Sequence, residues 1–152
     1  MKVEDLMTKR IVTVGFDDTL GTVREIFEET GIHHLLVVEG RELQGVVSDR
    51  DLLRALSPFV DSVVETHRDK STLSKRVHQI MSRAPKTLRP DAGLAEAVQL
   101  FLDHKVSCIP IVDSEFRPVG IVSWRDVMKT YADMLNATDA TDTAVLADAA
   151  QA

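Results

Sequence analysis

The sequence predicts a protein of the α/β (α+β) class, in which two copies of one strand–helix–strand–strand–helix unit pack sheet against sheet. The stretches GVVSDRD (residues 45–51) and GIVSWRD (residues 120–126) share a glycine, two apolar residues, a serine, an arginine and an aspartate in the same order. The residues before them also correspond, with Met7 matching Met81 at an offset of 74 positions. Self-similarity at a fixed offset indicates an internal duplication. One unit of about 50 residues buries too little apolar surface to be stable alone, so we expect the copies to pair about a pseudo-two-fold axis and to leave two related clefts.

We assign residues 1–57 to the first copy. Its expected elements are a helical turn at 1–7, a strand at 11–14, a helix at 20–30, strands at 33–38 and 43–48, and a second helix from 49 to about 56. The β-branched run at 11–14 favours a strand, whereas apolar side chains at helical spacing in the next segment favour a helix. Asp17 or Asp18 is the candidate N-cap of that helix, and Gly31 suits its left-handed C-cap.

The second copy covers residues 77–133, and a polar segment at 58–76 links the two. This linker is too long for a tight connection, so we expect a loop that includes some helix. After Tyr131 the composition shifts to Ala, Thr and Asp, and residues 136–152 carry no positive charge. We expect residues 134–152 to form a flexible acidic and Ala-rich tail with, at most, a short helix at 144–150.

Composition and charge exclude several classes of protein. The 152-residue chain is 44% apolar and 28% charged, as in ordinary globular proteins. Its formal net charge of −6 argues against general binding to nucleic acid or to an anionic membrane, because there is no basic excess to release counterions. The single cysteine, Cys108, excludes an intramolecular disulfide and a cysteine-rich metal site. With no signal-like N-terminus and no apolar run near ~18 residues, we expect a cytoplasmic protein that spans no membrane.

The serine and aspartate of each repeated motif are the candidate binding residues. Ser48 with Asp51, and Ser123 with Asp126, stand where a buried strand passes into a helix. A hydroxyl and a carboxylate at this spacing can cap the helix, a role worth about 1 kcal/mol, or they can hold the hydroxyls of a ribose. Both interpretations stay open at this stage.

The arginine of each motif is a second candidate. Arg50 and Arg125 fall in the first turn of a helix, where a cation is unfavourable against the helix dipole. They can therefore contact a phosphate, or they can form surface salt bridges.

His33 and His34 are candidate phosphate contacts rather than a metal pair. Adjacent residues of a strand point to opposite faces, so the two cannot chelate one ion together. The alternative is one packed and one exposed histidine without a ligand role. Trp124 either stacks at the rim of a cleft or covers a dimer contact. Neither copy shows a nucleophile–base pairing, a Gly-rich phosphate loop or a carboxylate pair, so the sequence does not predict an enzyme.

The ordered motifs resemble the cystathionine-β-synthase (CBS) domain, present twice. The first copy carries MT (7–8), DDTL (17–20), HHLLVV (33–38) and GVVSDRD (45–51), and the second carries MS (81–82), CIPIVD (108–113) and GIVSWRD (120–126). The resemblance covers residues 1–133 and is greatest to small stand-alone CBS pairs of the acetoin-utilisation type. It implies a Bateman module, in which two CBS motifs bind adenosine-containing ligands in the clefts between them and pair again into a disc-like homodimer.

The resemblance also implies roles for individual residues. The corresponding positions are Ser48, Asp51, Ser123 and Asp126 at the ribose hydroxyls, Thr13 and Thr87 in the segments that flank the adenine, and His33 and His34 at the phosphate. The second copy departs from the first here, because Ser107 and Cys108 replace the two histidines. The first copy in turn has Leu36 where the second keeps the proline, Pro110, that is common in the family.

These observations favour a non-enzymatic sensor. It would bind AMP, ADP, ATP or S-adenosylmethionine, require no cofactor, and act by conformational change on an effector protein whose identity is unknown. The alternative is a dimeric protein-interaction module with empty or vestigial clefts. A small hydrolase or a metal-binding regulator is a third hypothesis.

Overall fold

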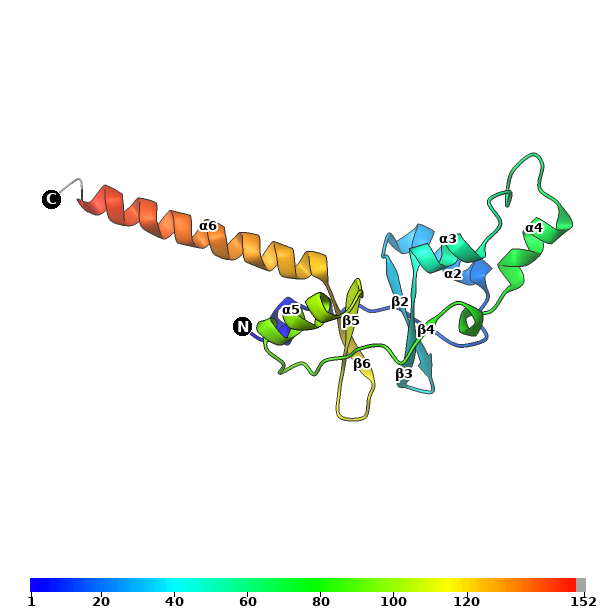
Figure 1. The fold of residues 1–152 in the computed structure, drawn as a ribbon, viewed down its shortest axis with the longest axis horizontal. Helices are drawn as coiled ribbons and strands as arrows, with labels where there is room; N and C mark the ends of the chain where they lie inside the picture. Colours follow the sequence, from blue (N-terminus) through cyan, green and yellow to red (C-terminus); the bar gives the residue numbers. More distant parts are fainter. Residues whose placement is uncertain (150–152) are drawn as a thin grey trace.

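The computed structural model describes the backbone of residues 1–149 and the side chains of residues 1–138. The helices are α1 (Val3–Leu6), α2 (Leu20–Thr30), α3 (Asp49–Ala55), α4 (His67–Ser71), α5 (Leu94–Asp103) and α6 (Trp124–Ala149), with 3-10 turns η1 (Thr72–Ser74) and η2 (Val77–Gln79). The strands are β1 (Thr13–Val14), β2 (His34–Glu39), β3 (Glu42–Ser48), β4 (Ser82–Arg83), β5 (Cys108–Val112) and β6 (Pro118–Ser123). The predicted α/β fold class is confirmed (Figure 1).

The two sheets share one topology. In the first sheet the order is β1-β2-β3-β4, with β1 parallel to β2 and the other pairs antiparallel. The second sheet pairs β5 with β6, and single bridges extend it at both edges. Leu88 bridges Ile111 in parallel, as β1 does β2, and Thr8 bridges Ile121 antiparallel, as β4 does β3. The duplication seen in the sequence is therefore a duplication of the sheet.

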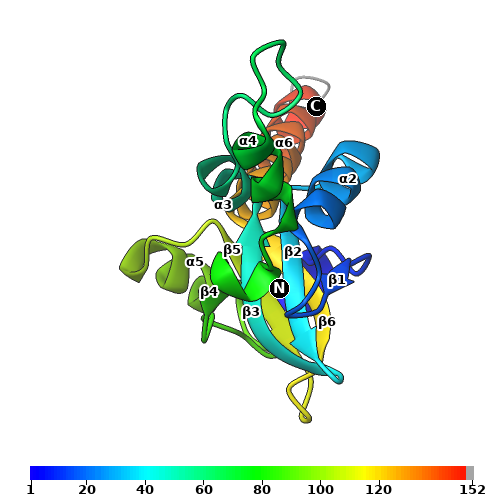
Figure 2. The same ribbon diagram turned by 90° about the vertical axis from the view of Figure 1, so that its right-hand side faces the viewer.

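The sheets pack face to face, as Figure 2 shows. The apolar cluster between them consists of Leu36, Leu43, Val46, Cys108 and Val112, with Ile11 and Ile121 packed against it. The amide of Leu43 also donates to the carbonyl of Phe116 at 3.0 Å, which ties the two hairpins together. Sheet-on-sheet packing supplies the burial that one copy lacks.

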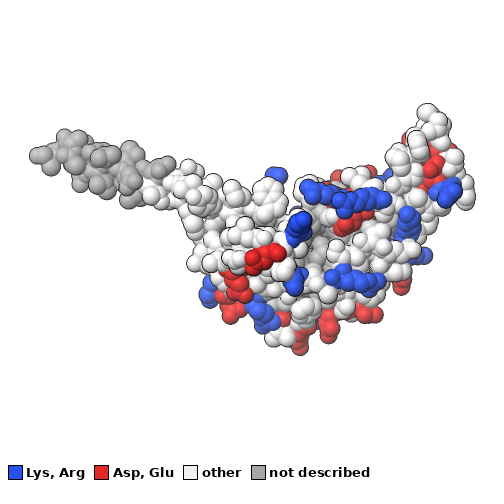
Figure 3. All heavy atoms as spheres, in the orientation of Figure 1, with Lys and Arg blue, Asp and Glu red and all other residues white. Residues whose placement is uncertain are grey.

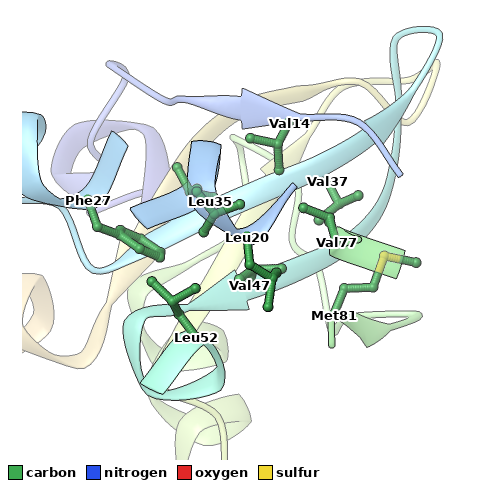
Figure 4. Close-up of a cluster of buried hydrophobic side chains, with 10 residues drawn as sticks. Val14, Leu20, Phe27, Leu35, Val37, Val47, Leu52, Val77 and Met81 are labelled. Carbon is green, nitrogen blue, oxygen red and sulfur yellow. The ribbon is translucent and has the colours of Figure 1, made fainter. Parts of the chain in front are cut away.

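The first segment of each copy packs on the other copy. Val77 and Met81, which open the second copy, lie in the core of the first (Figure 4), together with Val14, Leu20, Val23, Phe27, Leu35, Val37, Val47 and Leu52. Val3 opens the first copy but lies in the core of the second, with Leu88, Ala97, Ile109, Ile111 and Val122. Backbone bonds fix both exchanges, because Val3 donates to Ala92 at 2.8 Å and Val77 donates to Asp18 at 2.9 Å. The packing units of the fold thus differ from the sequence copies.

The glycine of each repeated motif allows this exchange. A Cβ atom at Gly45 would lie 2.6 Å from the carbonyl oxygen of Ser82, and one at Gly120 would lie 2.5 Å from the sulfur of Met7. Each glycine therefore lets the exchanged segment approach the strand closely.

The sequence predicted the C-cap of helix α2 correctly but not its N-cap. Its N-cap is Thr19, whose Oγ1 accepts from the amide of Thr22 at 3.2 Å, rather than either of the two predicted aspartates. The carboxylate of Asp18 instead accepts from the amide of Gly15 at 2.7 Å, in the turn before the helix. Gly31 has the expected left-handed conformation, with φ of 65°.

The C-terminal segment differs most from the expectation. Helix α6 runs unbroken from Trp124 to Ala149, whereas from residue 134 onward we expected a flexible tail with a short helix at 144–150. No proline or glycine occurs in this stretch and alanine is frequent, so nothing in the local sequence ends the helix. The helix projects from the rest of the molecule (Figure 1). Residues 150–152 lie outside the described residues.

The linker forms a loop that contains α4 and η1, as expected. Among the described residues, no helix combines the length and the apolar character needed to cross a membrane.

Candidate functional site

A cavity of about 490 Å³ lies where the two copies meet, and we call it the central cavity. It is lined by the loop before β1, the starts of β2, α3 and α6, and the ends of β3 and β6. Its residues are Thr8, Arg10, Ile11, Val12, Ile32, His33, His34, Leu36, Ser48, Asp49, Arg50, Leu53, Ser107, Ile121, Ser123, Trp124, Arg125 and Asp126. Apolar walls with convergent polar groups are typical of small-ligand sites.

The predicted serine–aspartate pairs both form capping boxes. Asp126 Oδ2 accepts from the amide and the hydroxyl of Ser123, each at 2.7 Å, while the Asp126 amide donates to Ser123 Oγ at 3.3 Å. Ser48 and Asp51 repeat this arrangement at 2.8, 2.8 and 3.2 Å. The structural role considered from the sequence is therefore present at both motifs.

A third capping box shows what is particular to the motifs. Thr66 and Asp69, in the linker, make the same three bonds, but Asp69 Oδ1 also accepts from the hydroxyl of Ser57 at 2.7 Å. Within residues 1–138, Oδ1 of Asp126 and Oδ1 of Asp51 accept no hydrogen bond. Each motif aspartate thus caps a helix with one oxygen and keeps the other as an open acceptor.

The central cavity brings together most of the predicted site residues. Those that line it are His33, His34, Ser48, Arg50, Ser123, Arg125 and Asp126. Thr13 and Thr87 do not line it, and neither does Asp51. The Asp51 carboxylate acts on two neighbouring side chains, since it raises the pKa of the Cys108 thiol and opposes the lowering of the His34 pKa.

The two histidines make different contacts. His33 Nδ1 lies 2.8 Å from Oδ2 of Asp49, and His34 Nε2 lies 2.7 Å from Oγ of Ser107, which belongs to the other copy. Strand β2 begins at His34, so alternation along the strand does not govern His33, and both residues line the cavity. Burial lowers the pKa of His34 below its ordinary value, against the opposing effect of the Asp49 carboxylate.

Three further residues of the cavity were not among the predicted site residues: Arg10, Asp49 and Trp124. Arg10 precedes β1, and the duplication gave no signal for it, because the corresponding residue of the second copy is Ala84. Tryptophan has the largest side chain, yet Trp124 is 53% exposed. This exposure fits the position at the rim of a cleft that was considered from the sequence.

Burial excludes Cys108 from polar chemistry at the site. It raises the pKa of the thiol to about 12, with a smaller contribution from the Asp51 carboxylate. Across the described residues, no group of three or more His, Cys, Asp or Glu side chains is placed to hold a metal ion.

Comparison with known proteins identifies the family to which this architecture belongs. The CBS domain family matches residues 3–58 and 77–133. A CBS domain-containing protein of Dictyostelium discoideum is 33% identical over 128 residues, which span 83% of this chain and 88% of the relative. Seven further curated relatives are longer proteins, and the chain spans 20% to 47% of their length.

Two solved structures are similar over nearly their whole length. An acetoin utilization protein of Vibrio cholerae has a TM-score of 0.72 at 27% identity, over 91% of this chain and 96% of that one. CBSX2 of Arabidopsis thaliana, in complex with AMP, has a TM-score of 0.72 at 26% identity, over 88% of this chain and 97% of that one. The fold is that of a tandem CBS pair. The chain belongs to the CBS domain family, as its motifs predicted.

Proposed function

We propose that this chain is a non-enzymatic regulatory module that binds an adenine nucleotide in the central cavity. The observation that carries the proposal is Asp126, a residue of the cavity lining whose Oδ2 closes the helix cap while its Oδ1 accepts no hydrogen bond within residues 1–138. A carboxylate oxygen suits a ribose hydroxyl, which donates a hydrogen bond. The cavity volume of about 490 Å³ lies within the range of roughly 300–1,000 Å³ that small ligands occupy. The AMP complex of CBSX2 supports adenosine as the nucleoside.

The response to the ligand follows from the composition of the cavity wall. Both copies contribute to it, and so does Trp124, the first residue of α6. A ligand shifts a protein between two arrangements only by binding one of them better. A nucleotide that contacts both copies favours one relative arrangement of the sheets, and α6, about 39 Å long at ~1.5 Å per residue, carries a small displacement at Trp124 to a distant surface. An effector protein would respond to that change.

The exposed face of α6 supports a homodimer. Trp124, Met128, Tyr131 and Leu135 recur at spacings of four, three and four residues and are each about half exposed. This spacing places them in one apolar stripe along the helix, which we call the α6 stripe. Leu53, the counterpart of Met128 in the first copy, is 74% exposed. Two related apolar faces on one pseudo-symmetric chain favour a second copy as the partner.

The α6 stripe also supports the second candidate function, a dimeric interaction module with empty clefts. A thermal-shift screen of the full chain against AMP, ADP, ATP, adenosine and S-adenosylmethionine separates the two. A ligand that binds only the folded state adds RT ln(1 + [L]/Kd), or about 2.7 kcal/mol at 100 Kd, so we expect a rise in Tm of several degrees with an adenine nucleotide. A flat screen at millimolar concentrations would contradict the sensor and favour the interaction module.

A further inference from the structure

Three arginines around the central cavity lack partners in the structure. Arg10, Arg50 and Arg125 all line it, and none of their guanidinium groups forms a hydrogen bond or an ion pair with any of the residues whose side chains the structure describes. Elsewhere, Arg24 pairs with Asp61 and Arg117 pairs with Asp113. Arg41 and Arg54 are also unpaired among the described residues, so what distinguishes Arg10, Arg50 and Arg125 is that all three line one cavity.

These guanidinium groups come from three elements that meet only in the folded chain. Arg10 lies in the loop before β1, Arg50 in the first turn of α3 and Arg125 in the first turn of α6. The carboxylates of the cavity are Asp49, which faces His33, and Asp126, which is committed to its cap through Oδ2. The lining therefore carries three arginines against two aspartates, in a chain whose net charge is −6. Figure 3 shows Lys and Arg side chains where the projecting helix leaves the body of the molecule.

The second copy lacks several of the basic residues that the first copy contributes to the central cavity. The residues that correspond to Arg10, His33 and His34 are Ala84, Ser107 and Cys108. Cys108 is buried, and its raised pKa keeps the thiol neutral. Only Lys86, which corresponds to Val12, adds a cation that the central cavity lacks. The duplication has thus kept the motif arginine and aspartate in both copies, whereas Arg10 and the two histidines occur only in the first.

We infer that the central cavity selects a nucleoside di- or triphosphate, held through its phosphates by Arg10, Arg50 and Arg125, and that each chain binds one such ligand. The inference rests on the proposed function, because the same cavity must first accept the nucleoside. Guanidinium–phosphate bonds are charge-assisted and frequently bidentate, so affinity rises with the number of phosphates. The same charges disfavour S-adenosylmethionine, whose sulfonium group is a cation.

Isothermal titration calorimetry on the full chain tests this with ATP, ADP, AMP, adenosine and S-adenosylmethionine, in buffer without divalent cations. We expect one site per chain, ATP at least roughly tenfold tighter than AMP, and ATP affinity that falls as NaCl is raised. The variant Arg10→Ala should lose roughly tenfold in ATP affinity and leave the affinity for adenosine unchanged. Arg41→Ala is the matched control, since it removes the same charge from the exposed turn between β2 and β3 and should change neither.

The outcomes separate this inference from the proposed function. If no adenosine compound binds, the proposed function fails and this inference with it. If ATP, AMP and adenosine bind with equal affinity, if S-adenosylmethionine binds as tightly as ATP, or if two ligands bind per chain, the proposed function stands and this inference is overturned. An Arg10→Ala variant that binds ATP like the parent chain would also overturn it.

Discussion

Asp126 combines a structural role with the binding role that we propose for it. Oδ2 closes the first turn of α6, while Oδ1 accepts no hydrogen bond from residues 1–138 and the residue lines the central cavity. Asp69 makes the same cap outside the cavity, but both of its oxygens are used within the fold. The chain therefore contains an internal reference for the structural role alone.

This reference makes a sharp test possible. We expect Asp126→Ala to lower the free energy of unfolding by about 1 kcal/mol through the lost cap, and to reduce affinity for an adenine nucleotide at least tenfold. Asp69→Ala should lower stability by a similar or larger amount, since it also loses the bond from Ser57, and leave affinity unchanged. Chemical denaturation and calorimetric titration of both variants measure the two effects. Equal affinity in the two variants would show that Asp126 only caps.

His34 gives the fold a dependence on pH. Burial lowers its pKa in the folded protein below the value of the unfolded chain, so the unfolded state binds the proton more readily. The stabilising effect of a neutral His34 is complete above about pH 6.5, the ordinary histidine pKa, and is lost as the pH falls from there through the folded-state pKa. Urea denaturation at pH 7.5 and 5.5 should show a larger loss for the parent chain than for His34→Gln, which keeps a polar side chain beside Ser107. An equal loss in both proteins would assign the pH dependence to other groups.

The elements differ in how far local sequence determines them. The hairpins β2–β3 and β5–β6 follow from short apolar runs around turns, and Gly31 ends α2 as a C-cap glycine should. The N-cap of α2 was mispredicted because three consecutive polar residues compete for it, and Thr19 prevails when Asp18 closes the preceding turn. The length of helix α6 was underestimated because its composition resembles that of a polar tail. The helix continues because no residue in the segment ends it.

We expect the motif glycines to matter for the close packing of strands rather than for ligand binding. Replacing Gly45 by alanine places a Cβ against the backbone oxygen of Ser82, which cannot rotate away. We expect a loss of roughly 1–3 kcal/mol in unfolding free energy, as for other overpacked sites. Gly93→Ala is the control, because no atom lies within 4 Å of the added Cβ. Thermal unfolding of the pair measures the difference, and equal Tm values would contradict the close approach of β4 to β3.

At the scale of the whole molecule, the sequence predicted the duplication and the sheet-to-sheet packing but not the exchange of first segments. Val3 and Val77 have the same apolar neighbours in sequence whichever core they join, so only the three-dimensional path of the chain distinguishes the two arrangements. Arg10 was missed for a related reason, since a feature present in one copy leaves no trace in a repeat. Sequence thus predicts the symmetric part of the fold, including the matched Arg50 and Arg125, whereas Arg10 belongs to an asymmetric part.

The homodimer that we propose would form through the α6 stripe. If two chains pair through it, Met128→Asp places an uncompensated charge in the interface, and the dimer should dissociate at concentrations where the parent chain remains paired. Asn136→Asp adds the same charge on the same helix away from the stripe, on an exposed residue, and should leave the dimer intact. Sedimentation equilibrium measures both.

Because Leu53 and Trp124 line the central cavity and also belong to these apolar faces, a saturating nucleotide should shift the dimer dissociation constant of the parent chain. A parent chain that sediments as a monomer at all concentrations would contradict the dimer, and one whose dissociation constant is the same with and without bound nucleotide would contradict coupling through α6.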